Sequence, residues 1–404
     1  MFNQYTISQF RSLKTPFYYY NADLLNKTLA AIRSSAEFYN YKVHYAVKAN
    51  ANEKILRTIS NNGFGADCVS GNEIEKAIQC GFDPKNIVFA GVGKGDDELQ
   101  FAIENNIFSI NCESIQELEV IDYFAGMLNK KASVALRVNP NIDAHTHHNI
   151  TTGLTINKFG ISENELYTIL SNRELYKNLI INGLHFHIGS QITDNTVFVN
   201  LCNKINQIQK YIYEKNIYLP HLNVGGGLGI NYESPINQIP DFGAYFSVFH
   251  NNLKLYKIQQ VHFEPGRSVV GQSGSIITKV LYVKENSGRK TIICDAGFTE
   301  LLRPALYQSS HKIINITSET GSSVYDVAGP ICETSDYFAK DIIMPETNRG
   351  DLIAILSAGA YGEAMASQYN LRSLANNYFS NELEAYRLKS NLIPASVEPE
   401  FLQK

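Results

Sequence analysis

The sequence has few cysteines, and none are spaced for a disulfide framework or a zinc site. The six stand at positions 68, 80, 112, 202, 294 and 332, and no CxxC pair occurs. Scattered thiols are typical of proteins kept in a reducing compartment. The first residues, MFNQYTISQFRSLKTPFYYYN, also lack the apolar segment of a signal peptide. We therefore expect a cytoplasmic protein with free thiols.

Long apolar runs and an excess of basic charge are missing as well. No stretch is apolar over enough residues to cross a membrane. Lys and Arg number 35 against 39 Asp and Glu, and no basic patch stands out. Nucleic acid and membrane partners are therefore not expected.

A histidine-rich stretch, HTHH at 145–148, is a poor candidate for a metal site. It lies in a predicted loop with no partner motif, whereas a metal site needs three or four ligands in fixed geometry. We expect no metal. The long segment around this stretch is instead predicted to be a lid or binding loop.

After residue 40, a short β-rich segment, a polar or glycine-containing loop and an amphipathic helix recur. The strand candidates are 43–47, 64–70, 86–91, 107–114, 132–140, 181–190, 221–229 and 260–266. Eight such units over about 230 residues predict an α/β fold of the TIM type, a (β/α)8 barrel. A doubly wound open sheet is the alternative.

Beyond residue 266 the pattern changes to strands without long helices between them. The candidates are 275–286, 290–297, 311–317, 322–329 and 351–359. They predict a C-terminal antiparallel β domain, and the early segment TPFYYYN is expected to add a strand to it. The expected domains are therefore residues 1–30, joining the β domain, the cofactor-binding barrel at 31–266, and the β domain at 267–404 with substrate and dimer contacts.

Polar and charged residues gather at the C-terminal ends of the predicted barrel strands. Chemistry in (β/α)8 barrels is located at these ends. The residues found there are Lys48, Asp67, Glu73, Arg137, His185, His187, Ser190, Gly225, Gly226, Gly227, Glu264, Pro265, Gly266 and Arg267.

These residue types suit a phosphorylated, aromatic aldehyde. Lys48 can form a Schiff base, and Glu264 can pair with a ring nitrogen and keep it protonated. The triplet 225–227 lets the main chain approach a phosphate, which Arg267 can neutralise. The pattern therefore predicts pyridoxal 5'-phosphate as cofactor.

Each of these residues also has a simpler reading when taken alone. A single lysine is usually a solvated surface group, and a buried histidine is usually a core residue with a hydrogen-bond partner. Their shared position at strand ends favours function. On that reading His187, Asp67 and Glu73 pack against or brace the ring and the lysine.

The motifs resemble those of a known family. They are, in order, YAVKAN, GADCVSGNE, FHIGSQ, GGGLGI, EPGRSVV, DAGF with LLRPALY, GPICE and GAYGEAMASQYN. Over nearly the whole chain they are similar to the fold-type III pyridoxal-phosphate-dependent decarboxylases with an alanine racemase-like barrel, and among them to the meso-diaminopimelate decarboxylase family.

The resemblance implies roles for residues in the second domain. Arg303 and Tyr307, with Arg267, would hold the substrate carboxylate, and Glu333 would hold the distal ammonium. Cys332 would be the acid that reprotonates Cα. Tyr361 would contact both the cofactor, through its phosphate, and the substrate.

The resemblance also implies a reaction and an assembly. The chain would be a carboxy-lyase that converts meso-2,6-diaminopimelate to L-lysine and carbon dioxide, the last step of lysine biosynthesis. It would form a head-to-tail homodimer with shared active sites, in which the partner subunit supplies Cys332 and Glu333.

Three other functions are open to a barrel of this kind. One is decarboxylation of another basic amino acid or of carboxynorspermidine, but a plain diamine precursor has no distal carboxylate for Arg303. Another is amino-acid racemisation, which needs a second base such as tyrosine where GPICE offers Cys332. The third is a cofactor carrier without catalysis, which leaves residues 267–404 unexplained.

Overall fold

The computed structural model describes residues 2–143, 153, 157–235, 238–256 and 259–383. The chain divides into two compact units. One comprises Met1–Leu25, Tyr232–Ile236 and Gln272–Lys404, and the other comprises Asn26–Asn231 and Asn237–Gly271.

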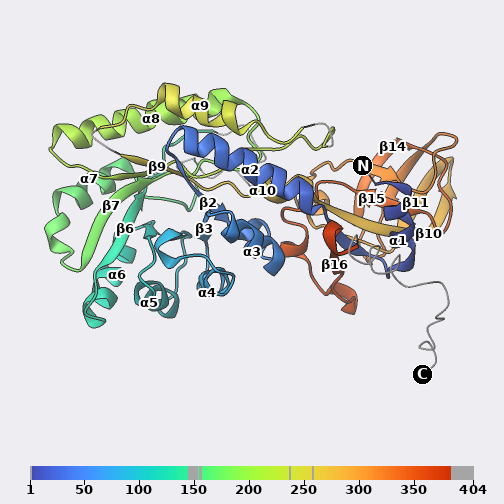
Figure 1. The fold of residues 1–404 in the computed structure, drawn as a ribbon, viewed down its shortest axis with the longest axis horizontal. Helices are drawn as coiled ribbons and strands as arrows, with labels where there is room; N and C mark the ends of the chain where they lie inside the picture. The colour runs from blue at the N-terminus through green and yellow to red at the C-terminus, as the bar shows by residue number, and fades with distance from the viewer. Residues whose placement is uncertain (1, 144–152, 154–156, 236–237, 257–258, 384–404) are drawn as a thin grey trace, which may run out of the picture. The chain divides into compact units, whose positions relative to one another are not determined.

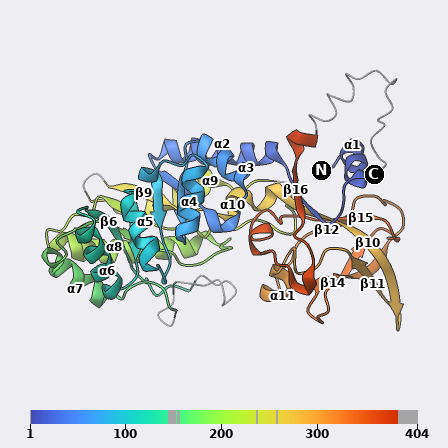
Figure 2. The ribbon, with the colours of Figure 1, turned by 90° about the horizontal axis from the view of Figure 1, so that it is seen from below.

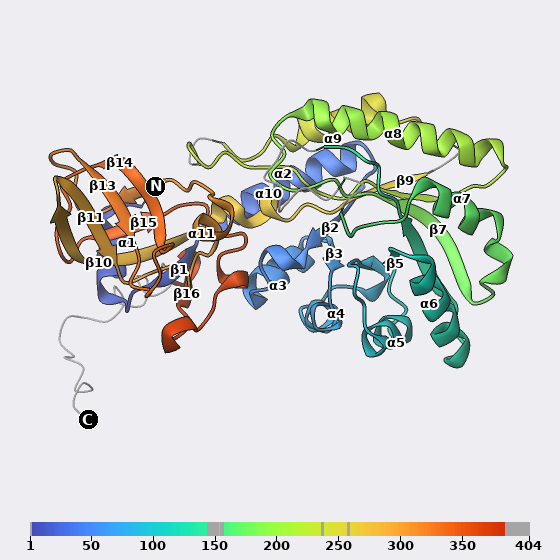
Figure 3. The ribbon, with the colours of Figure 1, turned by 180° about the vertical axis from the view of Figure 1, so that it is seen from behind.

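The larger unit contains a closed barrel of eight parallel strands (Figures 1 and 3). The strands are β2 (Lys42–Ala46), β3 (Gly65–Cys68), β4 (Ile87–Phe89), β5 (Ser109–Cys112), β6 (Ala132–Arg137), β7 (Leu179–His185), β8 (His221–Asn223) and β9 (Gln260–Phe263). The barrel closes because β2 pairs with β9, with Val43 opposite Phe263. The predicted (β/α)8 barrel is confirmed, and the open-sheet alternative is wrong.

Helices connect the barrel strands, as the sequence pattern predicts. They are α2 (Ala22–Phe38), α3 (Glu53–Asn61), α4 (Gly71–Gln79), α5 (Asp96–Glu104), α6 (Ile115–Met127), α7 (Glu163–Ser171), α8 (Asn195–Glu214), α9 (Phe242–Asn252) and the short α10 (Arg267–Val270). Side-chain caps start several of them, because a side-chain oxygen satisfies an unpaired backbone N–H group at the helix start. Asn52 caps α3 in this way, and Ser70 caps α4. Helices α8 and α9 lie side by side in Figures 1 and 3.

The smaller unit is built on a sheet of eight strands. They are β1 (Phe17–Tyr20), β10 (Gly274–Asn286), β11 (Arg289–Cys294), β12 (Ile313–Asn315), β13 (Ser323–Ala328), β14 (Tyr337–Met344), β15 (Leu352–Ile355) and β16 (Asn376–Phe379). Pairing is antiparallel except for β11 with β13 and β1 with β16. The predicted β domain is confirmed, including its N-terminal strand, because β1 pairs with β10.

Two strands of this sheet are absent from the sequence prediction. In β14 most side chains are exposed or half-buried, with Phe338 and Met344 as its buried apolar residues, so no alternating apolar pattern marks it. In β16 the first residues are two asparagines. Polar strands of this kind are recognised through their pairing with a neighbour and not through their composition.

The start of the chain is held to this sheet by an aromatic core. Helix α1 (Gln4–Ser12) buries Phe10 completely, and its ring packs edge-on against Phe17 and Tyr19 of β1. Ile277 of β10 and Leu352 of β15 belong to the same cluster. Figure 2 shows α1 and these strands, and a second short helix, α11 (Arg303–Tyr307), lies in the same unit. Among the described residues no helix is both long and apolar enough to cross a bilayer.

Candidate active site

Lys48 lies just past the end of β2, in a single 3-10 turn, Val47–Ala49. Its ammonium nitrogen is 3.0 Å from Oδ2 of Asp67 on β3. The lysine side chain is 35% exposed, whereas that of Asp67 is 1% exposed. Burial and the charge of Glu264 raise the pKa of Asp67 to about 7, and the ammonium of Lys48 opposes that rise. The lysine is therefore accessible, and the buried carboxyl group of Asp67 orients its ammonium.

Glu264 follows β9 and is buried. Its Oε2 is 2.9 Å from Nε2 of His185, and its Oε1 accepts hydrogen bonds from Asn223 at 2.6 Å and Asn111 at 3.2 Å. Burial opposes ionisation, but the imidazole of His185 and the ammonium of Lys48 outweigh it and hold the pKa of Glu264 below its usual value. A carboxylate has about four acceptor sites, and three are used here. One is left for a further donor.

The glycines at 225–227 sit where no side chain fits. A Cβ atom at Gly226 would lie 2.1 Å from the carbonyl oxygen of Glu264, and Gly225 has a φ of +74°. The N–H of Gly225 donates to Oδ1 of Asn223, and the N–H of Gly226 donates to Nδ1 of His187. Two of the three glycine amides are thus engaged within the barrel, and the loop is held firmly.

His187 accepts a hydrogen bond through Nδ1, so its proton is on Nε2 and the ring is neutral. Burial lowers the pKa of His187 well below its usual value, and the positive charges of Lys48 and Arg137 act in the same direction. A neutral imidazole can pack against an aromatic ring without the cost of burying a charge.

Arg267 is the first residue of α10 and is buried. Its Nη2 donates to the hydroxyl of Ser190 at 2.9 Å. The preceding Gly266 leaves little space for a side chain, because a Cβ there would lie 3.0 Å from the Cβ of Ala46 and 3.1 Å from that of Ala49. A guanidinium and a hydroxyl are thereby brought together, as a phosphate site requires.

A second buried ion pair supports the ends of β5 and β6. Nη1 of Arg137 lies 2.6 Å from Oε1 of Glu113, and both side chains are buried. The other carboxylate oxygen of Glu113 accepts the N–H of Gly160. The predicted bracing residue Glu73 lies in the first turn of α4, where its carboxylate accepts the N–H of Val69 and interacts with the charge of Lys48.

The sequence prediction misses the side chains of Asn111, Glu113 and Asn223. Asn111 and Asn223 are buried polar residues on β5 and β8. A polar residue at an inward position of a barrel strand is the signal that could have found them, because such positions are usually apolar.

The remaining predicted site residues all belong to the smaller unit. Arg303 opens α11 and is buried, and its Nη1 donates to the hydroxyl of Tyr232 at 2.8 Å and lies 2.9 Å from Nε2 of His311. Tyr307 is half-buried at the end of the same helix. Tyr361 is half-buried too, with a φ of +60°.

Cys332 and Glu333 lie on the loop between β13 and β14. Cys332 is exposed, and its backbone N–H donates to Oδ1 of Asn370. Glu333 accepts a hydrogen bond from the hydroxyl of Tyr369 at 2.9 Å. The loop is fixed from within by Asp336, whose carboxylate accepts the N–H of Ile331. An accessible thiol and a carboxylate are thus presented next to each other.

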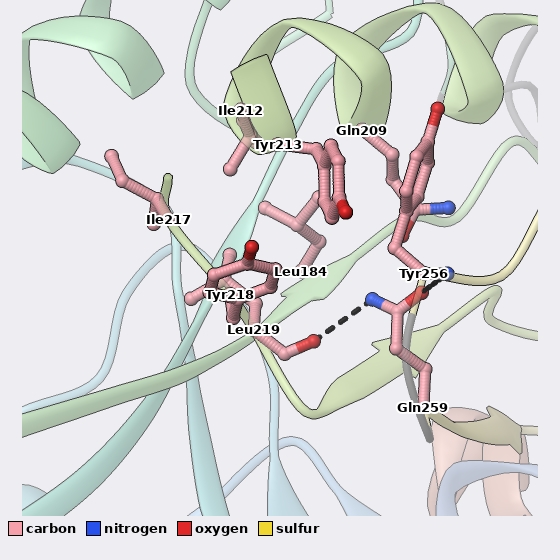
Figure 4. A pocket seen from close by; sticks show the side chains of 9 residues that line it. All are labelled: Leu184, Gln209, Ile212, Tyr213, Ile217, Tyr218, Leu219, Tyr256 and Gln259. Carbon is pink, nitrogen blue, oxygen red and sulfur yellow. Dashed lines mark hydrogen bonds between the residues drawn. The ribbon is translucent and has the colours of Figure 1, made fainter. Parts of the chain in front are cut away.

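Other features of the described residues do not compete with this site. No cluster of three or more metal-ligating side chains occurs among them, and HTHH at 145–148 lies outside the described residues, as does much of the predicted lid. Figure 4 shows a small pocket beside α8, where Gln259 donates to the carbonyl of Leu219. Its described lining contains no ionisable group other than tyrosine: Leu184, Gln209, Ile212, Tyr213, Ile217, Tyr218, Leu219, Tyr256 and Gln259.

The barrel residues fit pyridoxal 5'-phosphate. An accessible lysine suits the aldehyde, and a buried carboxylate with one open acceptor site suits a protonated ring nitrogen. A loop without side chains, with a guanidinium and a hydroxyl nearby, suits the phosphate. The fit rests on this donor set, and the glycines at 225–227 keep the loop close to neighbouring backbone oxygens, which a Cβ there would meet.

Comparison with known proteins agrees with this fit. Residues 23–271 match the family described as "Pyridoxal-dependent decarboxylase, pyridoxal binding domain". The chain is 54% identical over 381 residues to the diaminopimelate decarboxylase of Bacteroides thetaiotaomicron, covering 94% of this chain and 99% of that protein. The crystal structure of diaminopimelate decarboxylase from Helicobacter pylori complexed with L-lysine has a TM-score of 0.87 at 39% identity, covering 96% and 100% of the two chains. The corresponding M. jannaschii structure with L-lysine has a TM-score of 0.86 at 33% identity, covering 93% and 89%. This chain therefore belongs to the diaminopimelate decarboxylase family of pyridoxal-dependent decarboxylases.

Proposed function

We propose that this protein uses pyridoxal 5'-phosphate to decarboxylate meso-2,6-diaminopimelate, releasing L-lysine and carbon dioxide as the last step of lysine biosynthesis. The observation that carries the proposal is the presence of an accessible Lys48 and a buried Glu264 at the ends of strands of one barrel, in a chain that is 54% identical to a diaminopimelate decarboxylase. L-Lysine in the related crystal structures supports the product.

The barrel residues would hold the cofactor at both of its ends. Lys48 would hold the aldehyde carbon, with Asp67 orienting its ammonium group. The loop at 225–227, with Ser190 and Arg267, would hold the phosphate. His187, neutral and half-buried, would pack on the face of the ring. Pro265 and Gly266 of the barrel would also belong to the cofactor site, and Tyr361 of the smaller unit would reach the phosphate.

When bound, pyridoxal phosphate supplies an electron sink for the pair that carbon dioxide leaves on the substrate Cα. Glu264 would favour a proton on the ring nitrogen, because a buried carboxylate favours the charged form of an adjacent base. Contacts from Asn111, Asn223 and His185 surround this carboxylate, and the charges of His185 and Lys48 lower its pKa against the effect of burial.

The smaller unit would bind the distal end of the substrate. This end carries an ammonium and a carboxylate, and both remain in the product. Arg303 and Tyr307, with Arg267, would hold the carboxylate, and Glu333 would pair with the ammonium. Cys332 would return a proton to Cα from its thiol. A plain basic amino acid lacks the distal carboxylate, so it would forgo the charged contact that Arg303 offers.

The proposal includes an assembly and a location. Two chains would form a head-to-tail homodimer in which the partner subunit supplies Cys332 and Glu333 to each barrel. The exposure of the Cys332 thiol supports this arrangement. The barrel at 31–266 would bind the cofactor, and residues 267–404 with 1–30 would form the substrate and dimer domain. All six cysteines are free thiols, which supports a cytoplasmic location.

The function is tested by carbon dioxide release from the holoenzyme. Purified protein with pyridoxal phosphate is incubated separately with meso-diaminopimelate, lysine, ornithine and arginine. We expect release from meso-diaminopimelate with L-lysine as the product. Equal or faster release from lysine or ornithine would instead assign the chain to decarboxylation of basic amino acids.

A further inference from the structure

We propose that Asn223 is a positioning residue that orients the carboxylate of Glu264 and couples it to the glycine loop at 225–227. The inference rests on the proposed function, in which Glu264 faces the ring nitrogen and the loop faces the phosphate. It assigns a role to a side chain that sequence motifs do not mark.

Asn223 is the last residue of β8 and is 5% exposed. Its Nδ2 donates to Oε1 of Glu264 at 2.6 Å, and its Oδ1 accepts the N–H of Gly225 at 2.9 Å. An amide that accepts from a backbone N–H can present only its NH2 group to the carboxylate. The orientation of the side chain is therefore defined by its two partners.

The backbone repeats this connection. The N–H of Glu264 donates to the carbonyl of Gly225 at 2.8 Å, and the carbonyl of Glu264 lies where a Cβ of Gly226 would be. The carboxylate and the glycine loop thus form one rigid assembly. Asn223 is the side chain that bridges them, so displacing it affects both ends of the cofactor site.

The other two donors complete the carboxylate's surroundings. Asn111 donates to the same oxygen as Asn223, which fills Oε1, while His185 uses one of the two sites on Oε2. Nδ1 of His185 and Oδ1 of Asn111 are buried without a hydrogen-bond partner among the described residues. The open acceptor site is therefore on Oε2, and the donors of Oε1 decide how the carboxylate is rotated.

The substitution Asn223→Asp replaces the NH2 group that donates to Oε1 of Glu264 by a carboxylate oxygen, and the side chain keeps its shape. One aspartate oxygen can still accept the N–H of Gly225. The other would face Oε1 of Glu264 at about the distance that Nδ2 has now. Two carboxylates this close in a buried site cannot both be ionised, so they share a proton. Glu264 then loses the full negative charge that keeps the ring nitrogen protonated.

The experiment compares wild type, Asn223→Asp, Asn223→Ser and a matched control, all reconstituted with pyridoxal phosphate carrying 15N in the ring. The control is Asn182→Asp, which introduces the same charge at another buried asparagine of a barrel strand. Asn182 bonds Ser133 and is outside the contacts of Glu264. The measurements are the 15N shift of the ring, cofactor affinity, kcat and KM.

In Asn223→Asp we expect the ring nitrogen to move from the protonated to the neutral shift, and kcat to fall at least about tenfold with KM nearly unchanged. In Asn223→Ser, which adds no charge, we expect the protonated shift to remain and cofactor affinity to fall about tenfold, because the glycine loop loses its tie. Asn182→Asp should keep the wild-type shift.

A protonated ring and a wild-type kcat in Asn223→Asp would overturn the inference. If that variant does not fold, unchanged cofactor affinity in Asn223→Ser would overturn it. The ring measurement needs no substrate. A wild-type protein that binds the cofactor but releases no carbon dioxide from meso-diaminopimelate would therefore disprove the proposed function, while the shift still tests Asn223.

Discussion

Nζ of Lys48 lies 3.0 Å from Oδ2 of Asp67, although the two residues are separated by a strand–helix unit of the barrel. Oδ1 of Asp67 is buried without a hydrogen-bond partner among the described residues. The side-chain hydrogen bond of Asp67 is thus made to Lys48. It keeps the ammonium at the barrel mouth, where an aldehyde can reach it.

Lys48 is expected to be the cofactor attachment site. Lys48→Ala should lose the visible absorbance of the bound cofactor and essentially all decarboxylation, because no other primary amine takes its place. The measurement is an absorbance spectrum after reconstitution, together with carbon dioxide release. Lys42→Ala, at the exposed start of β2, is the control and should retain both. Retention of the visible band in Lys48→Ala would disprove the assignment.

Glu264 is expected to control turnover and not cofactor retention. Glu264→Gln keeps a side chain of the same shape and leaves the phosphate contacts intact. It removes the negative charge that keeps the ring nitrogen protonated, so kcat should fall on the order of a hundredfold or more. Bound cofactor is measured after gel filtration, and kcat by carbon dioxide release. A normal kcat would show that the carboxylate does not face the ring nitrogen.

Cys332 is expected to act across a subunit boundary. Lys48→Ala and Cys332→Ala should each be inactive, because one lacks the attachment site and the other the proton donor. After subunit exchange, half of the dimers are mixed and each has one intact site, so roughly a quarter of wild-type activity should return. Exchange is confirmed by native mass measurement.

The control mixes Lys48→Ala protein with Glu264→Gln protein. Both substitutions lie in barrel residues, so subunit exchange cannot place an intact Lys48 and an intact Glu264 in one barrel. In a mixed dimer of these variants each site carries one lesion, so activity should stay at the level of the parents. If the Cys332 mixture also stays at that level after complete exchange, Cys332 acts within its own chain or not at all.

Three histidines inside the barrel form a hydrogen-bonded chain. Nδ1 of His44 lies 2.9 Å from the carbonyl oxygen of Asn86, and its Nε2 lies 2.9 Å from Nδ1 of His262. Nε2 of His262 lies 3.1 Å from Nδ1 of His221. Burial lowers the pKa of all three, that of His262 well below its usual value, with His44 and His221 contributing to the shift at His262. The chain is therefore neutral in the folded protein.

The three neutral histidines should make the protein less stable in acid. Below about pH 6.5 the unfolded state binds protons that the folded state cannot, so the free energy of unfolding falls as pH falls through that range. Each buried histidine contributes at most about 1.4 kcal/mol per pH unit. Urea unfolding of the holoenzyme at pH 7.5 and 5.5 measures the loss.

His262→Gln should reduce the loss by about 1 kcal/mol, since one buried imidazole is removed from the linkage. His250→Gln is the matched control, because His250 is exposed on α9 and should leave the pH dependence as in wild type. An equal loss in His262→Gln and wild type would mean that the histidine chain does not govern acid stability.

The sequence determined the barrel and the motif-bearing part of its site. The eight βα units have local signatures, and Lys48, the glycine triplet and Glu264 stand next to strand ends whose common location follows from parallel pairing. The N-terminal strand could be assigned to the β domain because its apolar, aromatic composition precedes the barrel pattern. It pairs with β10 as expected.

The donors of Oε1 of Glu264 became apparent only in the tertiary structure, although His185, which contacts Oε2, stands at a predicted strand end. Asn111 and Asn223 come from β5 and β8, which are not neighbours in the barrel, and each looks in sequence like any polar residue near a strand end. Their convergence on one carboxylate depends on barrel closure and on which side of each strand faces inward. The charge state of Glu264 likewise depends on burial and on donors distant in sequence, and local sequence patterns carry no information about either.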